Sequence, residues 1–240
     1  NGGFLANFKP DLTVGEMRGK ILFLVRNQFN ELCSLNYGGY MPTWVEEPDT
    51  SLPHTIVSYD GDATHTGKLL IQDKSNASAT GMIDVKKGYI QTVLGYMGNL
   101  NWTSDPVWCL NLISGYSKTD NVAGKDISRT DGYMDNAQHM NTYVYEYLKG
   151  LRDARGERAL GNYKPAGIVF ADYVGLNSVT FKLDAFQSNN TYTTNGANLV
   201  HELILNNVRV KYKYALHHDY AGDTRYDLEP QTDGVTHKLE

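Results

Sequence analysis

Four short, mostly apolar runs are spaced along the chain, and each one passes into polar residues. They cover residues 21–25, 67–73, 106–113 and 166–172. Runs of this length and composition are typical of strands that are buried on both faces of a sheet. We therefore predict four strands, each ending where its apolar run meets a polar loop.

Segments with helical spacing lie between or after these runs. They cover residues 83–97, 137–153 and 196–207, and in the second of them Met140 and Val144 fall on one face. Strands that alternate with helices predict βαβ units and a parallel sheet, so the fold class is α/β. Four such strands fit half of an eight-stranded barrel or a small open sheet.

The remaining segments predict connections and edges. Residues 31–66 and 115–135 are long and irregular, and we expect polar loops there. Residues 180–194 predict a hairpin or a rim loop. Alternation of apolar and basic residues over 208–214 predicts an extra edge strand, and the polar end from 217 onward predicts a loosely ordered tail.

The bulk composition fits a soluble globular chain of one domain, or one domain with a tail. The chain has 240 residues, 41% hydrophobic and 20% charged, and a formal net charge of -5. The sequence also shows no basic patch and no RNA-binding or zinc-finger motif, so we expect no nucleic acid partner. No apolar run approaches the roughly 20 residues that a membrane-spanning helix needs.

The two cysteines, Cys33 and Cys109, do not make a disulfide framework, and their pairing stays open. The motifs of zinc sites, phosphate-binding loops and serine hydrolases are all missing from the sequence. Acidic residues over 60–62 and at Asp131 leave calcium as a weak option, because their spacing does not match an EF-hand loop.

Three charged residues stand where predicted strands end. Arg26, Asp73 and Asp172 each follow an apolar run, and the carboxyl ends of parallel strands meet at one mouth of a barrel. Carboxylates accept hydrogen bonds from neighbouring hydroxyls, and arginine donates to hydroxyl or phosphate oxygens, so the trio suits a polyol ligand. Alternatively, each acid caps a following helix or pairs with a lysine such as Lys74.

Several segments, in the same order and with similar spacing, resemble the bacterial phosphatidylinositol-specific phospholipase C family. The resemblance spans about residues 11–207. The segments that carry it are 14–26, 67–74, 110–115, 143–151, 169–173 and 196–200. Each of these motifs is modest by itself, and the ordered set is the specific signal.

The resemblance implies part of a distorted TIM-type (β/α) barrel, with strands that correspond to its second half, from about the fifth strand onward. It implies that Arg26, Asp73 and Asp172 hold the inositol headgroup, and it places Trp44 at the rim. Ser75 stands where the family has an aromatic residue stacked on the ring.

The two catalytic histidines of the family, one within a Gly-Thr-His-Asp element, have no counterpart in this sequence. In the family one acts as a base on the inositol 2-hydroxyl and the other as an acid on the leaving alkoxide. We therefore predict no catalytic residue in this chain. Residues 1–210 are predicted to be the C-terminal half of the barrel, and 211–240 an edge strand and tail.

The resemblance also implies partners and a location. The expected ligand is an inositol phospholipid or a soluble inositol phosphate, met at a membrane surface by peripheral contact. A missing N-terminal half or a second copy is expected to complete the barrel. The opening Asn1-Gly2-Gly3 is unlike a natural translation start, so we expect a fragment or a processed form. The expected location is extracellular or periplasmic.

Two other functions compete with a phosphodiesterase. In the first alternative, the chain is a non-catalytic sugar or inositol-phosphate binding module on a degenerate half-barrel. In the second, it is a glycoside hydrolase that uses Asp73 and Asp172 as its carboxylate pair. The second alternative requires the two carboxyl groups to lie within about 10 Å of each other.

Overall fold

The computed structural model describes most of the chain, in two compact units. The described residues are 4–13, 15–26, 38–51, 53–60, 63–100, 106–155, 165–181, 189–212, 215–218, 226–229 and 237–239. The first unit comprises Asn1–Ser75, Gly88–Leu112 and Gly167–Phe170. The second comprises Asn76–Lys87, Ile113–Ala166 and Ala171–Glu240.

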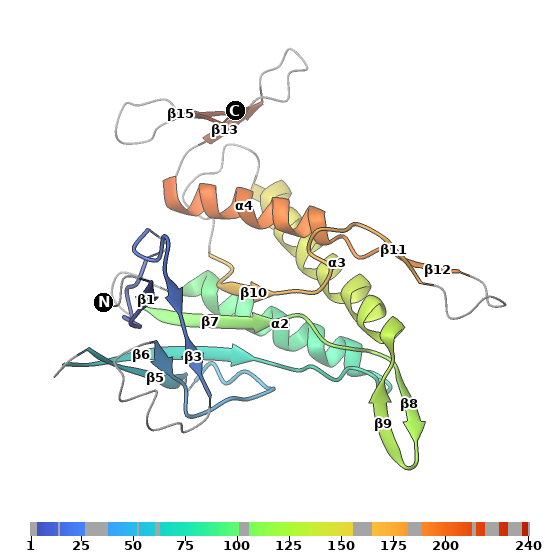
Figure 1. The fold of residues 1–240 in the computed structure, drawn as a ribbon. Coiled ribbons are helices and arrows are strands. Elements are labelled where there is room, and N and C mark those ends of the chain that lie inside the picture. Colours follow the sequence, from blue (N-terminus) through green and yellow to red (C-terminus); the bar gives the residue numbers. More distant parts are fainter. Residues whose placement is uncertain are drawn as a thin grey trace. The chain divides into compact units, whose positions relative to one another are not determined.

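The first unit is built on a curled, mixed sheet (Figure 1). The strand order is β10-β7-β6-β5-β4-β3. The strands are β3 (Leu24–Val25), β4 (Gly39–Tyr40), β5 (His54–Asp60), β6 (Ala63–Gln72), β7 (Val107–Leu112) and β10 (Ile168–Phe170). Strand β5 runs antiparallel to both of its neighbours, and the other pairs are parallel. The α/β class is confirmed, and β5 is a strand that the sequence did not reveal.

Both faces at the centre of this sheet are covered by apolar side chains. Helix α2 (Met82–Asn99) supplies Val93 and Met97 to a cluster with β6 and β7. The opposite face carries a second buried cluster, formed by Phe8, Met41, Ile56, Leu69, Ile71 and Leu110. Burial on two sides explains the nearly unbroken apolar sequences of β6 and β7.

The run over residues 21–25 is not buried on both faces, contrary to our prediction. It divides into β2 (Ile21–Leu22), which pairs with β1 (Leu5–Ala6), and the edge strand β3. Ile21 and Phe23 are 56% and 52% exposed. Short strands at a sheet edge or in a two-stranded sheet have few neighbours to cover their side chains, and an apolar run by itself does not distinguish such a strand from a central one.

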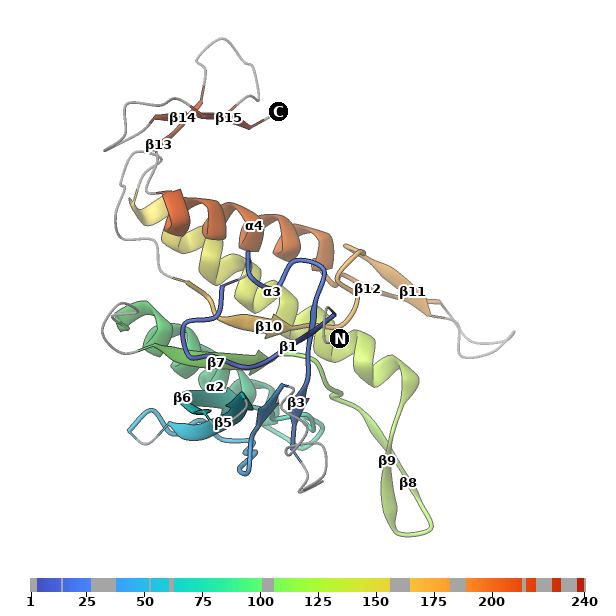
Figure 2. The same ribbon diagram turned by 60° about the vertical axis from the view of Figure 1, so that its left-hand side comes forward.

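In its described residues the second unit contains the start of α2, as far as Lys87, two helices that lie side by side and three small sheets (Figure 2). The helices are α3 (Thr130–Arg155) and α4 (Gly196–Tyr212). One hairpin joins β8 (Thr119–Val122) to β9 (Lys125–Ser128), and another pairs β11 (Val179–Phe181) with β12 (Asn190–Tyr192). The third sheet contains β13 (Ala215–His218), β14 (Tyr226–Glu229) and β15 (His237–Leu239).

Two predictions for this unit need correction. Residues 208–212 continue helix α4, so the predicted edge strand over 208–214 is wrong at these positions. Alternation over so few residues is weak evidence against a helix that no glycine or proline interrupts. Residues 119–128 form a hairpin within the segment predicted as a loop, and α3 already begins at Thr130. The hairpin predicted within 180–194 is confirmed by β11 and β12.

Cys109 lies in the core of the first unit as a free thiol, and burial raises its pKa to about 12, so the thiol is unreactive at neutral pH. Cys33 lies outside the described residues. None of the helices in the described ranges combines the length and apolarity that crossing a bilayer requires.

Candidate functional site

Three of the predicted site residues meet in the first unit. Arg26 follows β3, Asp73 follows β6, and Trp44 lies in the loop after β4. The guanidinium carbon of Arg26 is 4.3 Å from the centre of the Trp44 ring, and the indole Nε1 of Trp44 donates a hydrogen bond to Asp73 Oδ2 at 2.7 Å. Trp44 therefore joins a cation on its ring face to a carboxylate at its edge.

The polar groups of this cluster are only partly used. Arg26 is exposed, and among the described residues its guanidinium forms no ion pair. Asp73 is half-buried, and within the same ranges its second oxygen, Oδ1, accepts no hydrogen bond. Arg26 thus offers N–H donors to an anion, and Asp73 offers an acceptor to a hydroxyl group.

The loop that carries Trp44 is fixed by its next residues. The Glu46 carboxylate pairs with the Lys74 ammonium at 2.5 Å. Burial, together with the charge of Glu47 and a hydrogen bond to it, raises the pKa of Tyr89. The loop is therefore attached to the residue after Asp73, and its Glu47 lies close to Tyr89 of helix α2.

A buried amide pair fixes the end of β6. The side chain of Gln72 has no exposed surface, and its Nε2 donates to Asn111 Oδ1 at 3.0 Å. Its Oε1 accepts the main-chain N–H of Lys74 at 2.7 Å, which closes the turn around Asp73. Asn111 in turn donates to the main-chain oxygen of Ile90 at 3.2 Å. The position of Asp73 therefore depends on side chains that are fully hydrogen-bonded inside the sheet.

Asp172 belongs to the second unit. Its Oδ2 accepts the main-chain N–H of Gly115 at 3.1 Å, and its main-chain oxygen accepts a hydrogen bond from Asn141 Nδ2 at 2.8 Å. The next residue, Tyr173, has a φ of 56°, which is uncommon for an aromatic residue. It stays a prediction that Asp172 joins Arg26 and Asp73 in one site. The spacing of the two carboxylates that a glycosidase requires also stays a prediction.

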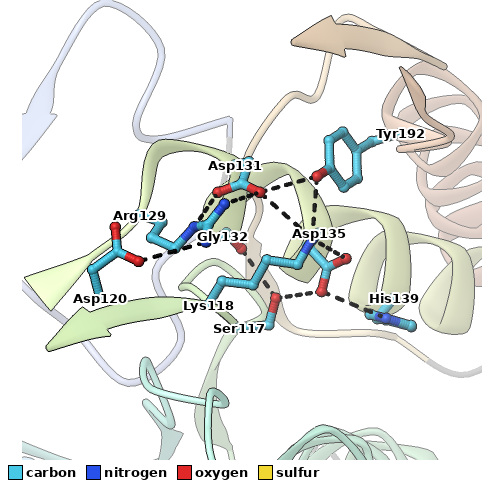
Figure 3. A network of polar contacts seen from close by, with 9 residues as sticks. All are labelled: Ser117, Lys118, Asp120, Arg129, Asp131, Gly132, Asp135, His139 and Tyr192. Atoms are coloured by element: carbon cyan, nitrogen blue, oxygen red, sulfur yellow. Dashed lines mark hydrogen bonds and ion pairs between the residues drawn. The ribbon is translucent and has the colours of Figure 1, made fainter. Parts of the chain in front are cut away.

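A second polar cluster lies in this unit, at the start of helix α3 (Figure 3). The Lys118 ammonium donates to the Tyr192 hydroxyl at 3.1 Å, and it lies 3.1 Å from Asp135 and 3.6 Å from Asp131. Arg129 donates two hydrogen bonds to Asp131, at 2.8 and 3.1 Å. We call these five residues the Lys118 cluster.

In the Lys118 cluster, hydrogen bonds and ion pairs together outweigh the effect of burial on the pKa values of Asp131 and Lys118. Burial by itself would raise the pKa of Asp131, but the hydrogen bonds and charge of Arg129 hold that pKa below its usual value. Burial would likewise lower the pKa of Lys118, but hydrogen bonds to Tyr192 and Asp135 raise it. Both groups therefore stay ionised at neutral pH, and neither exchanges a proton there.

The Lys118 cluster bears on the calcium hypothesis. Asp131, one of the acids considered for calcium, is bound by Arg129 and lies near Lys118. Within the described ranges, no three histidine, cysteine or acidic side chains are grouped in a way that could hold a metal ion. Residues 61–62 lie outside those ranges, so calcium binding stays an untested expectation.

Comparisons with known proteins give a distant structural likeness. No protein-family model and no curated protein matches the sequence. Two substituted variants of phosphatidylinositol-specific phospholipase C from Staphylococcus aureus are each 14% identical over 67% of this chain, with TM-scores of 0.36 and 0.34. This chain spans 39% and 38% of the length of those structures. A likeness this distant carries no argument about the reaction.

The histidines of the first unit lie away from Asp73. His54 pairs with Leu69 of β6, four residues before Asp73, and at about 3.3 Å per residue this is roughly 13 Å along the strand. His65 pairs with Ser58, farther down the same hairpin. Neither histidine is therefore within hydrogen-bond reach of Asp73 itself.

The aromatic ring beside Asp73 comes from a different loop than the resemblance implies. Ser75 is exposed and carries no ring, whereas Trp44 contacts Asp73 directly. The sequence placed Trp44 only at the rim, since nothing local indicates a partner 29 positions away.

Proposed function

We propose that this chain binds the headgroup of an inositol phospholipid through Arg26, Asp73 and Asp172, with Trp44 as a fourth contact. In this proposal it is the substrate-binding half of a phosphodiesterase of the phosphatidylinositol-specific phospholipase C type, on part of a (β/α) barrel. The observation that carries the proposal is the contact of Arg26 and Asp73 with a single indole ring at the ends of two strands.

The chemistry of the site suits this ligand. A phosphorylated inositol presents a dianion or a diester monoanion beside several adjacent hydroxyl groups. Arginine donates to phosphate or hydroxyl oxygens in a planar fork, and a carboxylate accepts from hydroxyl groups. The rim of the Trp44 ring offers apolar surface to the C–H groups of the inositol ring. The ordered segments that resemble the family support the same class of ligand.

Catalysis would need groups from elsewhere. The reaction is attack of the inositol 2-hydroxyl on the adjacent phosphodiester, with a base on that hydroxyl and an acid on the leaving alkoxide. The distance from His54 to Asp73 along β6 argues against a histidine of the first unit in either role. We therefore propose that a missing N-terminal half carrying the histidine pair completes the enzyme at an extracellular or periplasmic membrane surface. A second copy of this chain could complete the barrel, but it would not supply that pair.

The histidine positions also favour a second candidate, a non-catalytic module that binds an inositol phosphate. This module would use the same four residues, and it would bind the headgroup without cleaving the diester. Turnover, not binding, separates the two functions.

The test combines binding and turnover. We expect inositol 1-phosphate to bind in calorimetry, and Arg26→Ala or Asp73→Asn to weaken binding at least roughly tenfold through loss of a charged hydrogen bond. Arg18→Ala and Asp11→Asn, at exposed positions, are matched controls that should bind normally. Absence of binding by the unsubstituted chain would contradict both candidates.

Phosphatidylinositol vesicles then separate the candidates. Cleavage only after addition of a segment that carries a histidine pair supports the split phosphodiesterase. Binding without cleavage in either case supports the module. Cleavage by the chain alone would show that the predicted lack of a catalytic residue is wrong.

A further inference from the structure

A buried lysine lies behind Asp172 in the second unit. The side chain of Lys86, in helix α2, has no exposed surface, and its ammonium group donates a hydrogen bond to the main-chain oxygen of Ser114. Burying an ammonium group is costly unless acceptors surround it, and a long aliphatic residue would fill the same space at less cost. A lysine at this position therefore suggests a role for its charge.

One peptide group connects Lys86 to Asp172. The carbonyl of the Ser114–Gly115 peptide accepts the hydrogen bond from Lys86, and the N–H of the same peptide donates to Asp172 Oδ2 at 3.1 Å. A cation at the oxygen of an amide polarises it and makes its N–H a stronger donor. The lysine and the carboxylate thus lie at the two ends of one polarised amide.

The main chain on both sides of this contact is fixed by hydrogen bonds from buried side chains. Gly115 has a φ of 139°, a conformation open to glycine and strained for other residues. The buried Asn136 donates to the main-chain oxygen of Ile113 at 3.0 Å, and the buried Asn141 donates to that of Asp172 at 2.8 Å. These contacts leave the Ser114–Gly115 peptide little freedom to turn.

We propose that Lys86 is a positioning residue for Asp172. Through the Ser114–Gly115 peptide it holds the carboxylate in one orientation, with Oδ2 occupied by Gly115. Within the described residues Asp172 Oδ1 accepts no hydrogen bond, so it stays available for a ligand hydroxyl. The inference rests on the proposed function, since it explains how Asp172 is prepared for the inositol headgroup.

The coupling between Lys86 and Asp172 is testable without any ligand. In the isotope-labelled whole chain, we expect the amide proton of Gly115 to resonate downfield, and Lys86→Met and Asp172→Ala should each move it upfield. Lys86→Arg, which keeps the charge, should retain most of the downfield shift. Lys87→Met is the matched control, because Lys87 is the next residue of the same helix and pairs with Asp84 at 3.7 Å.

If Lys86→Met does not fold, Lys86→Gln is used instead, because glutamine lacks the charge and keeps a hydrogen-bond donor. An unchanged Gly115 resonance in a folded Lys86 variant would overturn the proposal, and so would an equal change in Lys87→Met. A lysine that stabilised the fold without polarising the Ser114–Gly115 peptide would alter the melting temperature and leave this resonance in place.

A double-mutant cycle then tests whether the coupling between Lys86 and Asp172 affects ligand binding. We expect Lys86→Met to weaken binding of inositol 1-phosphate about threefold to tenfold, the size of one hydrogen bond, and to have no further effect in the Asp172→Ala background. An equal loss in both backgrounds would overturn the positioning role. If the unsubstituted chain binds no inositol 1-phosphate while the Gly115 shift responds as expected, the proposed function fails and the positioning role of Lys86 stands.

Discussion

Trp44 determines the arrangement of the candidate site, because it contacts both Arg26 and Asp73. Its ring face carries the guanidinium group, and its N–H binds the carboxylate. A phenylalanine would preserve the first contact and remove the second. The two contacts are therefore separable by substitution.

Trp44→Phe should leave the Asp73 carboxylate without its indole donor and free to turn. We expect the free energy of unfolding to fall by about 1 to 2 kcal/mol in urea denaturation, and the affinity for inositol 1-phosphate to fall roughly fivefold. Trp108→Phe is the matched control, since it loses an N–H bond to the main-chain oxygen of Pro10 and leaves Asp73 untouched. Equal affinity losses in the two variants would contradict a specific role for Trp44.

The β8–β9 hairpin is attached to helix α3 by the Lys118 cluster and by close main-chain contact. A Cβ atom at Gly132 would lie 2.6 Å from the main-chain oxygen of Lys118, whereas one at Gly150 of the same helix would meet nothing within 4 Å. The two glycines of α3 therefore have opposite roles. One permits a close approach, and the other only weakens the helix.

Alanine at these two positions should shift stability in opposite directions. Gly150→Ala should raise the free energy of unfolding by about 0.5 to 1 kcal/mol through helix propensity. Gly132→Ala should lower it by about 1 to 3 kcal/mol, because the Lys118 main chain must move. Thermal and urea unfolding of both variants measure this difference, and a stabilised Gly132→Ala variant would show that the approach is not tight.

The Lys118 cluster also predicts how stability depends on acid. The pKa of Asp131 in the folded state lies below its ordinary value of 3.8, so its contribution to stability is present above that value and is lost as the pH falls through the folded-state pKa. We expect the melting temperature of Asp131→Asn to fall less between pH 6 and pH 3 than that of the unsubstituted chain. Asp126→Asn, at an exposed hairpin position, should keep the original acid dependence.

Those parts of the fold that local patterns encode could be predicted from the sequence. The apolar runs located β6, β7 and β10, and helical spacing located the three helices of the described ranges. The positions of Asp73 after β6 and of Arg26 after β3 could also be predicted, because a strand ends where apolar residues are followed by charged ones.

Contacts between distant residues could not be predicted in this way. The bond from Lys118 to Tyr192 joins positions 74 apart, and that from Trp44 to Asp73 joins positions 29 apart. The antiparallel strand β5 and the β8–β9 hairpin lie in polar segments whose pattern is equally typical of loops. In both cases the partner, not the segment itself, determines the structure.

The β8–β9 hairpin has a practical consequence for work with this protein. Its residues from 120 to 127 are all exposed, a Cβ atom at Gly124 would meet nothing within 4 Å, and its base is fixed by the Lys118 cluster. Exposed turn tips of this kind tolerate inserted sequence. A fluorophore, an affinity handle or a surface tether placed there would label the molecule at a defined point and leave the cluster at its base intact.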